Sequence, residues 1–455
     1  MFPPRLGLAQ TVCPTRAQLV IRCYLLSYWA GVAAYQPFLP VYLRAAGVGT
    51  IRIGAILSVS RLALVLSKPT LAAMADAFGC HRPVLFCSIV FSALFRCVLY
   101  LMAPNFAALL TVAVISEVVG GPAQDIADSS IMAMVQAQGR PASEYGQERL
   151  WGAIGYGWIS APLSGTLISV FGFKVAFINH LVLEMCAGFV SLNFTFESLA
   201  KDEHSMVEIA GTLCRRLGQP HIAVCLLLFY VFGASMGVVD GYLLVFLSDM
   251  GASSILSGWA LSVTCVVEVA VFMVATQLMT YLKMSNCLHT ILVCYILRLT
   301  WYSLLPQMPS LWWVLPIQSL HGFTFGLMWA TLTTFARGVA PEGMSTTVLS
   351  VFSSVFGGAG VVSGQVFGGV TYQKYGGVFL FRLTATILFV SNVGLLLLPK
   401  RYREQMNRDL AGMCVGNSDK GVENDPMHHT GGEAQSSTLY SSDLQRITKL
   451  SMDEC

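Results

Sequence analysis

Long apolar runs constrain this chain more than any other feature of its sequence. Each run contains about 20 or more mostly apolar residues, the length that a helix needs to cross a bilayer. Backbone inside lipid must satisfy its own hydrogen bonds, so we expect every run to be helical. The alternating pattern of a membrane barrel is absent. The twelve runs are 18–44, 51–75, 83–103, 106–136, 147–172, 174–196, 220–248, 253–281, 286–305, 310–337, 344–372 and 377–399.

The composition excludes several classes of function. The chain is 55% hydrophobic and 11% charged, whereas an ordinary soluble protein has roughly 25% charged residues. No basic cluster suited to nucleic acid is present, and the 13 cysteines show no zinc spacing. The sequence also lacks a nucleophile elbow, H-E-x-x-H and G-x-G-D. We therefore expect neither an enzyme, nor a metal site, nor a cofactor, nor a nucleic-acid partner.

The second half of the chain repeats part of the first half. Residues recur about 200 positions later, within or beside the apolar runs. A duplicated membrane unit is a hallmark of transporters whose halves move about a central site. We predict an all-α membrane protein with twelve transmembrane helices in two pseudo-symmetric six-helix halves. The repeated residues are Gly47, Gly54, Leu57, Ser58 and Val59 with Gly251, Gly258, Leu261, Ser262 and Val263, and Arg96, Tyr100, Pro104 and Gly120 with Arg298, Tyr302, Pro306 and Gly322.

Lysines and arginines in the connections predict the orientation. We read the first run as a retained span and expect both termini in the cytosol, with outer connections too short for a recognition domain. The predicted divisions are a cytosolic N-terminus (1–17), bundles at 18–196 and 220–399, a linker at 197–219 and a disordered tail at 400–455. Inward cations are Arg5, Arg16, Arg82, Arg140, Arg149, Lys201, Arg215, Arg216, Lys283, Arg337, Lys400, Arg401, Arg403 and Arg408, and outward ones are Arg44, Arg52, Lys174 and Lys374.

The connection between the second and third runs resembles a signature of the major facilitator superfamily. Residues 72–82 read AAMADAFGCHR, similar to the family pattern G-x-x-x-D-R-x-G-R-R. Asp76, Gly79 and Arg82 match the pattern. The resemblance implies that these three residues form a conformational gate, in which the aspartate bonds across the inner face and helps to hold the outward-open state.

Two further segments resemble one branch of that superfamily. Residues 320–330 read LHGFTFGLMWA, and residues 145–155 read YGQERLWGAIG. They are similar to a branch that holds lactose-permease-like and nucleoside–proton symporter-like carriers together with orphan eukaryotic members. Superfamily resemblance covers about residues 18–400 and implies the major facilitator fold.

The fourth run carries a polar stripe. Glu117, Gln124 and Asp128 share one helix face, and Asp125 lies beside them. Charge within a bilayer is costly, by roughly 2.5–3.5 kcal/mol on insertion scales, so this stripe must face protein or a water-filled cavity. We expect it to line a substrate cavity, as the fourth helix does in the resembled fold; the alternative is a set of structural ion pairs.

The second run places two cations on one face, Arg61 and Lys68, seven residues apart. They require anions, and Asp125 or Asp128 could supply them. Two interpretations remain open for Arg61 and Lys68, namely contact with the substrate and an ion pair with one of these aspartates.

The eighth, ninth and tenth runs carry Glu268, Arg298 and His321. A proton-coupled carrier needs a carboxylate in a dry site and a movable countercharge. We predict that these residues and Asp240 serve proton coupling, as the similar lactose-permease pattern implies. That pattern has a second acid one turn after the histidine, whereas this chain has Thr324.

The first run offers Tyr35 and Gln36 as substrate contacts. Gln36 corresponds to Asp240 in the repeat, and such positions converge near the pseudo-two-fold axis. Tyrosine on a cavity wall suits stacking on a ringed solute, although ordinary packing is an equally good interpretation. We expect His180 and Glu184, four residues apart, to form a local structural pair.

We expect a secondary transporter that moves a small polar solute by alternating access, with protons as coupled partners and the lipid bilayer as its environment. The alternative is a membrane receptor or scaffold on a carrier fold that transports nothing. We expect a monomer, in the plasma membrane or an intracellular membrane.

Overall fold

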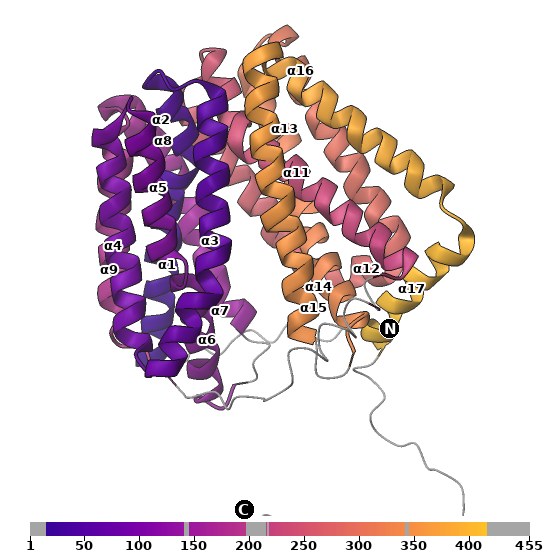
Figure 1. Cartoon of the computed structure of the whole chain (residues 1–455), viewed down its shortest axis with the longest axis horizontal. Coiled ribbons are helices and arrows are strands. Elements are labelled where there is room, and N and C mark those ends of the chain that lie inside the picture. The colour runs from indigo at the N-terminus through magenta and orange to yellow at the C-terminus, as the bar shows by residue number, and fades with distance from the viewer. Residues whose placement is uncertain (1–14, 141–144, 197–214, 216–217, 342–344, 416–455) are drawn as a thin grey trace, which may run out of the picture. The chain divides into compact units, whose positions relative to one another are not determined.

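The computed structural model describes residues 15–140, 145–196, 215, 218–341 and 345–415, in which every regular element is helical (Figure 1). This agrees with the prediction from the apolar runs. The first-half elements are α1 (Arg16–Tyr35), η1 (Gln36–Phe38), α2 (Leu39–Ala45), α3 (Thr50–Phe78), α4 (His81–Met102), α5 (Phe106–Gly120), α6 (Ala123–Gln136), α7 (Tyr145–Ala153), η3 (Ile154–Ser160), α8 (Ala161–Phe171) and α9 (Lys174–Ser191). The later elements are α11 (Pro220–Asp249), α12 (Ser254–Leu304), η4 (Leu305–Gln307), η5 (Leu311–Trp313), α13 (Val314–Gln318), η6 (Gly322–Leu327), α14 (Met328–Gly338), α15 (Ser345–Ser353), η7 (Ser354–Gly360), α16 (Val361–Leu397) and α17 (Lys400–Val415).

Local sequence explains where several helices begin and break. The side chain of Thr15 caps α1 in a capping box with Gln18. Pro37 lies in the short η1 turn that separates α1 from α2. Gly121 and Pro122 separate α5 from α6, so the predicted polar stripe of the fourth run crosses a break instead of following one uninterrupted helix.

Three segments, η3, η6 and η7, are π-helical. They fall within the fifth, tenth and eleventh predicted runs. A π segment widens the turn and is frequent at functional sites, because it changes which side chains face a neighbouring helix. The pattern of apolar residues does not predict these segments.

Eight helical stretches of the described residues are long and apolar enough to cross a membrane. Two of them, Ser254–Gln307 and Thr347–Leu397, are 54 and 51 residues long. Each is interrupted by a residue with positive φ, Lys283 at 63° and Gly376 at 81°. The sequence predicts one run on each side of Lys283 and one run on each side of Gly376. The count of twelve spans stays a prediction.

The buried apolar residues form separate clusters in the two parts of the chain. Two clusters draw their buried members from residues 21–196. The largest draws nearly all of its buried members from residues 222–410, with Val41 as the exception. Each part therefore has an apolar core of its own.

The predicted disorder from residue 400 onward is wrong for its first 16 residues, which form α17. Met406 and Leu410, one turn apart, are buried in the core of the second half. The side chain of Asn407 accepts a hydrogen bond from the Ser285 amide, and Asp409 lies 3.0 Å from His221. Residues 416–455 and nearly all of the predicted linker 197–219 lie outside the described residues.

Candidate functional site

A buried guanidinium organises the polar interior of the second half. Arg298 of α12 is 1% exposed and donates to Tyr302 at 3.1 Å, Thr324 at 2.6 Å, Gln318 at 3.0 Å and His321 at 3.2 Å. We call these five residues the Arg298 network. Tyr302 also donates to Gln318 at 2.5 Å. Pairing of four of its five N–H donors makes burial of this charged group tolerable.

His321 connects the Arg298 network to Glu268. A guanidinium can only donate, so Nδ1 of His321 accepts from Arg298 and its ring proton lies on Nε2. That nitrogen is 3.7 Å from Oε2 of Glu268. The predicted pair of Glu268 and Arg298 is therefore linked through the imidazole, and no direct ion pair joins the two among the described residues.

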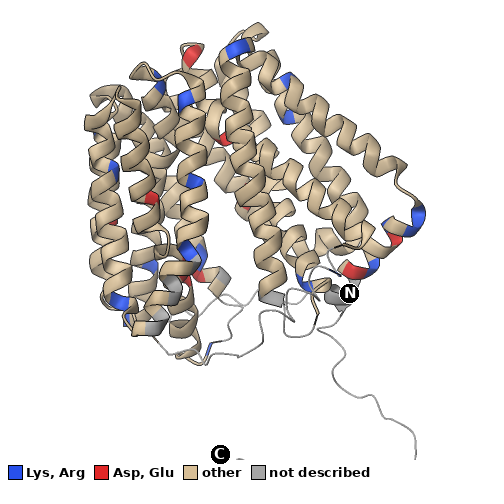
Figure 2. Ribbon diagram, viewed as in Figure 1, with Lys and Arg blue, Asp and Glu red and all other residues tan. Residues whose placement is uncertain are grey.

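Cations from both halves interact electrostatically with two acids of the second half, Glu268 and Asp240. The cation that acts on Glu268 is Arg149 of α7, from the first half of the chain. The cations that act on Asp240 of α11 are Arg61 and Arg298. Both carboxyl groups also interact electrostatically with Tyr156 of η3, which is half-buried. These interactions bring together polar groups from both halves, and Figure 2 shows charges of both signs along the helices as well as at their ends.

Sequence reasoning missed two residues of this region. The distribution of cations marks Arg149 only as an inward cation, and no sequence pattern marks Tyr156. The segment 145–155 pointed to the first of them, because the resemblance to a carrier branch passes through Arg149. Nothing in the sequence distinguishes Tyr156 from other tyrosines, since its position depends on the π segment η3.

Each acid predicted in the fourth run pairs with a cation. Glu117 accepts from Arg96 at 3.1 Å, and Asp128 accepts from Arg149 at 2.9 Å. Asp125 pairs with Lys68 at 3.2 Å, while Gln124 is half-buried. The ion-pair interpretation therefore describes these acids in this structure.

Among the described residues, Arg61 has no carboxylate within 4.0 Å. Its side chain is half-buried, and its predicted contact with a solute stays a prediction. Tyr35 is 5% exposed and packs on Phe177 and His180, which favours the packing interpretation, whereas Gln36 is exposed in the η1 turn.

The predicted inner gate is only partly visible. Gly79 ends α3 in the left-handed region at φ 60°, which favours glycine. Arg82 donates to the Phe194 carbonyl at 3.0 Å and ties the start of α4 to the residues after α9. The side chain of Asp76 lies outside the described residues.

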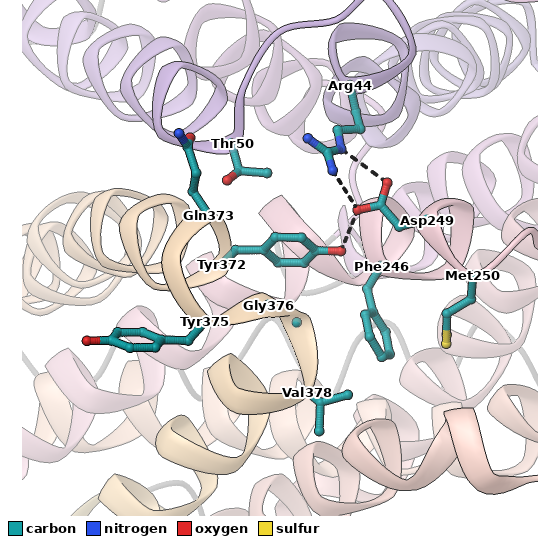
Figure 3. A pocket seen from close by; sticks show the side chains of 11 residues that line it. Arg44, Thr50, Phe246, Asp249, Met250, Tyr372, Gln373, Tyr375, Gly376 and Val378 are labelled. Atoms are coloured by element: carbon teal, nitrogen blue, oxygen red, sulfur yellow. Dashed lines mark hydrogen bonds and ion pairs between the residues drawn. The ribbon is translucent and has the colours of Figure 1, made fainter.

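A second polar cluster, absent from the sequence predictions, joins the halves near the repeated residues Gly47 and Gly251 (Figure 3). Arg44 donates two hydrogen bonds to Asp249, at 3.1 and 3.2 Å, and Tyr372 donates to Asp249 at 2.8 Å. We call these three residues the outer bridge. They line a cavity of about 460 Å³ with Thr50 and Gln373, among others.

Close helix contacts accompany the outer bridge. A Cβ on Gly54 of α3 would lie 2.6 Å from Gln365 O and Tyr242 Oη. A Cβ on Gly258 of α12 would lie 3.1 Å from Cα of Pro162 in α8. These repeat-related glycines both lie where a helix of one half crosses a helix of the other, so the repeat marks the packing between halves.

Known proteins resemble this chain in sequence as well as in fold. The model of the MFS_1 like family matches residues 19–383. The chain is 25% identical to the maltose permease of Geobacillus stearothermophilus over 84% of its own length and 94% of that protein. It is 27% identical to a major facilitator superfamily domain-containing protein 6-like of Danio rerio, over 43% of this chain and only 36% of that longer protein.

Solved transporters have the same fold. The nucleoside transporter NupG aligns with a TM-score of 0.70 at 16% identity, over 84% of this chain and 98% of its own. A D-xylose-proton symporter aligns with a TM-score of 0.57 at 13% identity, over 82% of this chain and 96% of its own. Identities this low concern the fold alone.

Proposed function

Since this chain belongs to the MFS_1 like family, within the major facilitator superfamily, we propose that it is a proton-coupled secondary transporter of a small polar solute. As an integral, multi-pass membrane protein of this family, the chain would move solutes across a membrane without changing them chemically. Alternating access then requires two halves, a central site and a closure on each side of it.

One observation carries the proposal of proton coupling, namely the chain of contacts from Arg298 through His321 to Glu268. Glu268 is held by no hydrogen bond among the described residues, and Arg149 acts on it while pairing with Asp128. A carboxyl with a histidine on one side and a displaceable cation on the other can gain and lose a proton as the halves move. Asp240 is the second candidate proton carrier.

Twelve spans are the architecture that we propose. The eight long stretches become ten when the breaks at Lys283 and Gly376 are counted. The segments α1–α2 and α13–α14 supply the remaining two. We further propose bundles at 18–196 and 220–399 joined by 197–219, cytosolic termini, a monomeric protein, and a place in the plasma membrane or an intracellular membrane.

The outer bridge and the glycine crossings support an inward-facing state. Their contacts join the halves near the ends of α2 and α11 and near the break of α16 at Gly376, all of which we propose to be extracellular. Asp76, Gly79 and Arg82 would form the opposing inner gate.

A sugar or a nucleoside is the proposed solute class. The relatives are named for maltose and nucleosides, and both are polyhydroxylated solutes without a net charge. Asp240 and Arg61 have free hydrogen-bonding capacity, and Tyr156 adds an aromatic face. Gln36, Gln124 and the paired acids Glu117, Asp125 and Asp128 are further proposed contacts, as is Tyr35 if the helices rearrange.

The proposal is tested first by thermal shift of the purified protein with a panel of sugars and nucleosides at two pH values. Any solute that stabilises the protein is then assayed in proteoliposomes. Glu268→Gln should abolish uphill accumulation driven by a proton gradient but preserve solute exchange, because exchange needs no net proton movement.

Glu404→Gln, in the exposed part of α17, is the matched control and should accumulate solute as the unmodified protein does. Unchanged accumulation in Glu268→Gln would remove Glu268 from proton coupling. Binding without flux in any variant would favour a receptor.

A further inference from the structure

Among the described residues of the first half, five buried polar atoms have no hydrogen-bond partner, namely Ser60 Oγ, Tyr24 Oη, Arg96 Nε, His180 Nε2 and Glu184 Oε1, and the last four belong to one group of residues. Tyr24, Arg96, His180 and Glu184 form one electrostatic group. Glu184 interacts electrostatically with Tyr24, and Arg96 interacts electrostatically with His180 and Glu184. Buried polar groups are normally paired. Such a concentration around one carboxyl group, outside the Arg298 network, requires a physical explanation.

Glu184 lies in a dry environment between α9 and α1. It is 1% exposed and His180 is fully buried. Nδ1 of His180 is 2.8 Å from the Gly31 carbonyl and 4.0 Å from Glu184 Oε1. A carbonyl only accepts, so Nδ1 carries the ring proton, and Nε2 has no acceptor that a second proton would need. The imidazole is therefore neutral here.

Helix α1 makes room for this carboxyl group. A Cβ on Gly31 would lie 3.0 Å from Glu184 Oε1 and 3.1 Å from its Cγ. Any larger residue would press on the side chain. The close approach places the acid against α1, where the neighbouring polar groups can respond to its charge.

No cation neutralises Glu184 among the described residues, because none lies within 4.0 Å of it apart from the neutral His180. Arg96, the cation that acts on it, bonds to Glu117 at 3.1 Å. An unpaired buried carboxylate is strongly destabilising, and protonation removes that cost. Glu184 therefore holds a proton in this arrangement.

The helices packed on α9 supply few other titratable groups. Among the pairings of described helices, α9 packs chiefly on α1, α4 and α8. The segment Ala161–Phe171 of α8 contains no titratable residue. The groups of α1 and α4 that interact electrostatically with Glu184 are Tyr24, Tyr28 and Arg96, and Arg96 also interacts with Tyr35.

We propose that Glu184 is a further proton-binding group of the transport cycle, separate from Glu268 and Asp240 and controlled by Arg96. While Arg96 pairs with Glu117, Glu184 keeps its proton. When Glu117 turns to the solute or moves with its helix, Arg96 uses its unpaired Nε to bind Glu184. The proton then leaves to water by way of Tyr28, whose side chain is half-buried and whose hydroxyl can pass a proton on but not keep it. This inference rests on the proposed proton coupling.

Infrared difference spectroscopy of the full chain in lipid nanodiscs tests the inference without any solute. The carbonyl band of a protonated carboxyl should disappear in Glu184→Gln, which has the shape of the protonated acid. Glu117→Gln should also remove the band of Glu184 near neutral pH, because it frees Arg96 to bind Glu184. Arg96→Gln should keep the band to higher pH than the unmodified protein.

Glu184→Asp retains the carboxyl group and should shift the band instead of removing it, which covers a failure of Glu184→Gln to fold. A band unchanged in Glu184→Gln, or unaffected by Glu117→Gln, would overturn the inference. Neither result bears on the role of Glu268 in proton coupling, because solute accumulation tests that role separately. Conversely, a band that behaves as expected beside proton-independent transport would refute coupling and with it the role of Glu184 in the cycle.

Discussion

At the scale of single residues, charge within an apolar run was the most useful signal. It singled out Arg298, Glu268 and His321 before their contacts were known. It could not identify Gln318 or Tyr302 as partners, because neutral polar residues are common in such runs and their contacts depend on how three helices pack. Thr324, where the resemblance leads one to expect an acid, accepts a hydrogen bond from Arg298 at 2.6 Å.

Arg298→Leu tests the structural weight of the Arg298 network. Removing the guanidinium leaves Thr324 and Nδ1 of His321 without their donor, whereas Gln318 keeps the hydrogen bond from Tyr302. Each unsatisfied buried group costs about 1–3 kcal/mol, so the melting temperature in detergent should fall clearly. Arg382→Leu, at an exposed arginine of α16, is the control and should change it little. Equal effects of the two variants would show that the network adds no stability.

At the scale of elements, the sequence predicted helices well but not their ends or irregularities. The breaks at Lys283 and Gly376 fall between predicted runs. The π segments were not predictable, since they arise from packing between helices. Helix α17 was missed because the polar composition around it resembles a disordered tail, and only Met406 and Leu410 anchor it in the core.

Leu410→Ala should loosen α17 from the second half. Leu410 is 2% exposed, and truncating a buried leucine costs roughly 2 kcal/mol at the lower end of measured values. Hydrogen exchange of residues 400–410 should then quicken while that of α11 stays slow. Gln405→Ala, at a half-buried position of the same helix, serves as the control. Slow exchange of α17 in Leu410→Ala would show that other contacts hold the helix.

At the scale of the whole molecule, the repeat predicts two similar halves, and two of its glycines prove to lie at contacts between those halves. Gly54 and Gly258 lie at close crossings of helices from opposite halves. The outer bridge was not predicted, because Arg44 and Asp249 are not equivalent in the repeat and only the three-dimensional closure brings them together. Opposite charges beside the repeated Gly47 and Gly251 were the available signal.

Arg44→Ala should favour opening of the outer side. The side chains of Arg44 and Asp249 are 40% and 30% exposed, so solvent screening limits the pair to about 1 kcal/mol or less. We expect hydrogen exchange in residues 50–58 and 365–373 to rise by up to about fivefold. Arg52→Ala, near the same end of α3, should leave it unchanged. No change in Arg44→Ala would mean that the glycine crossings alone hold the closure.

Solute accumulation in proteoliposomes is the most direct test of the central claim, that this chain is a proton-coupled transporter. With an inward proton gradient, a solute that stabilises the protein should accumulate above its external concentration, and a protonophore should reduce the process to equilibration. Accumulation that persists with the protonophore, or equilibration that the gradient never drives uphill, would contradict the claim.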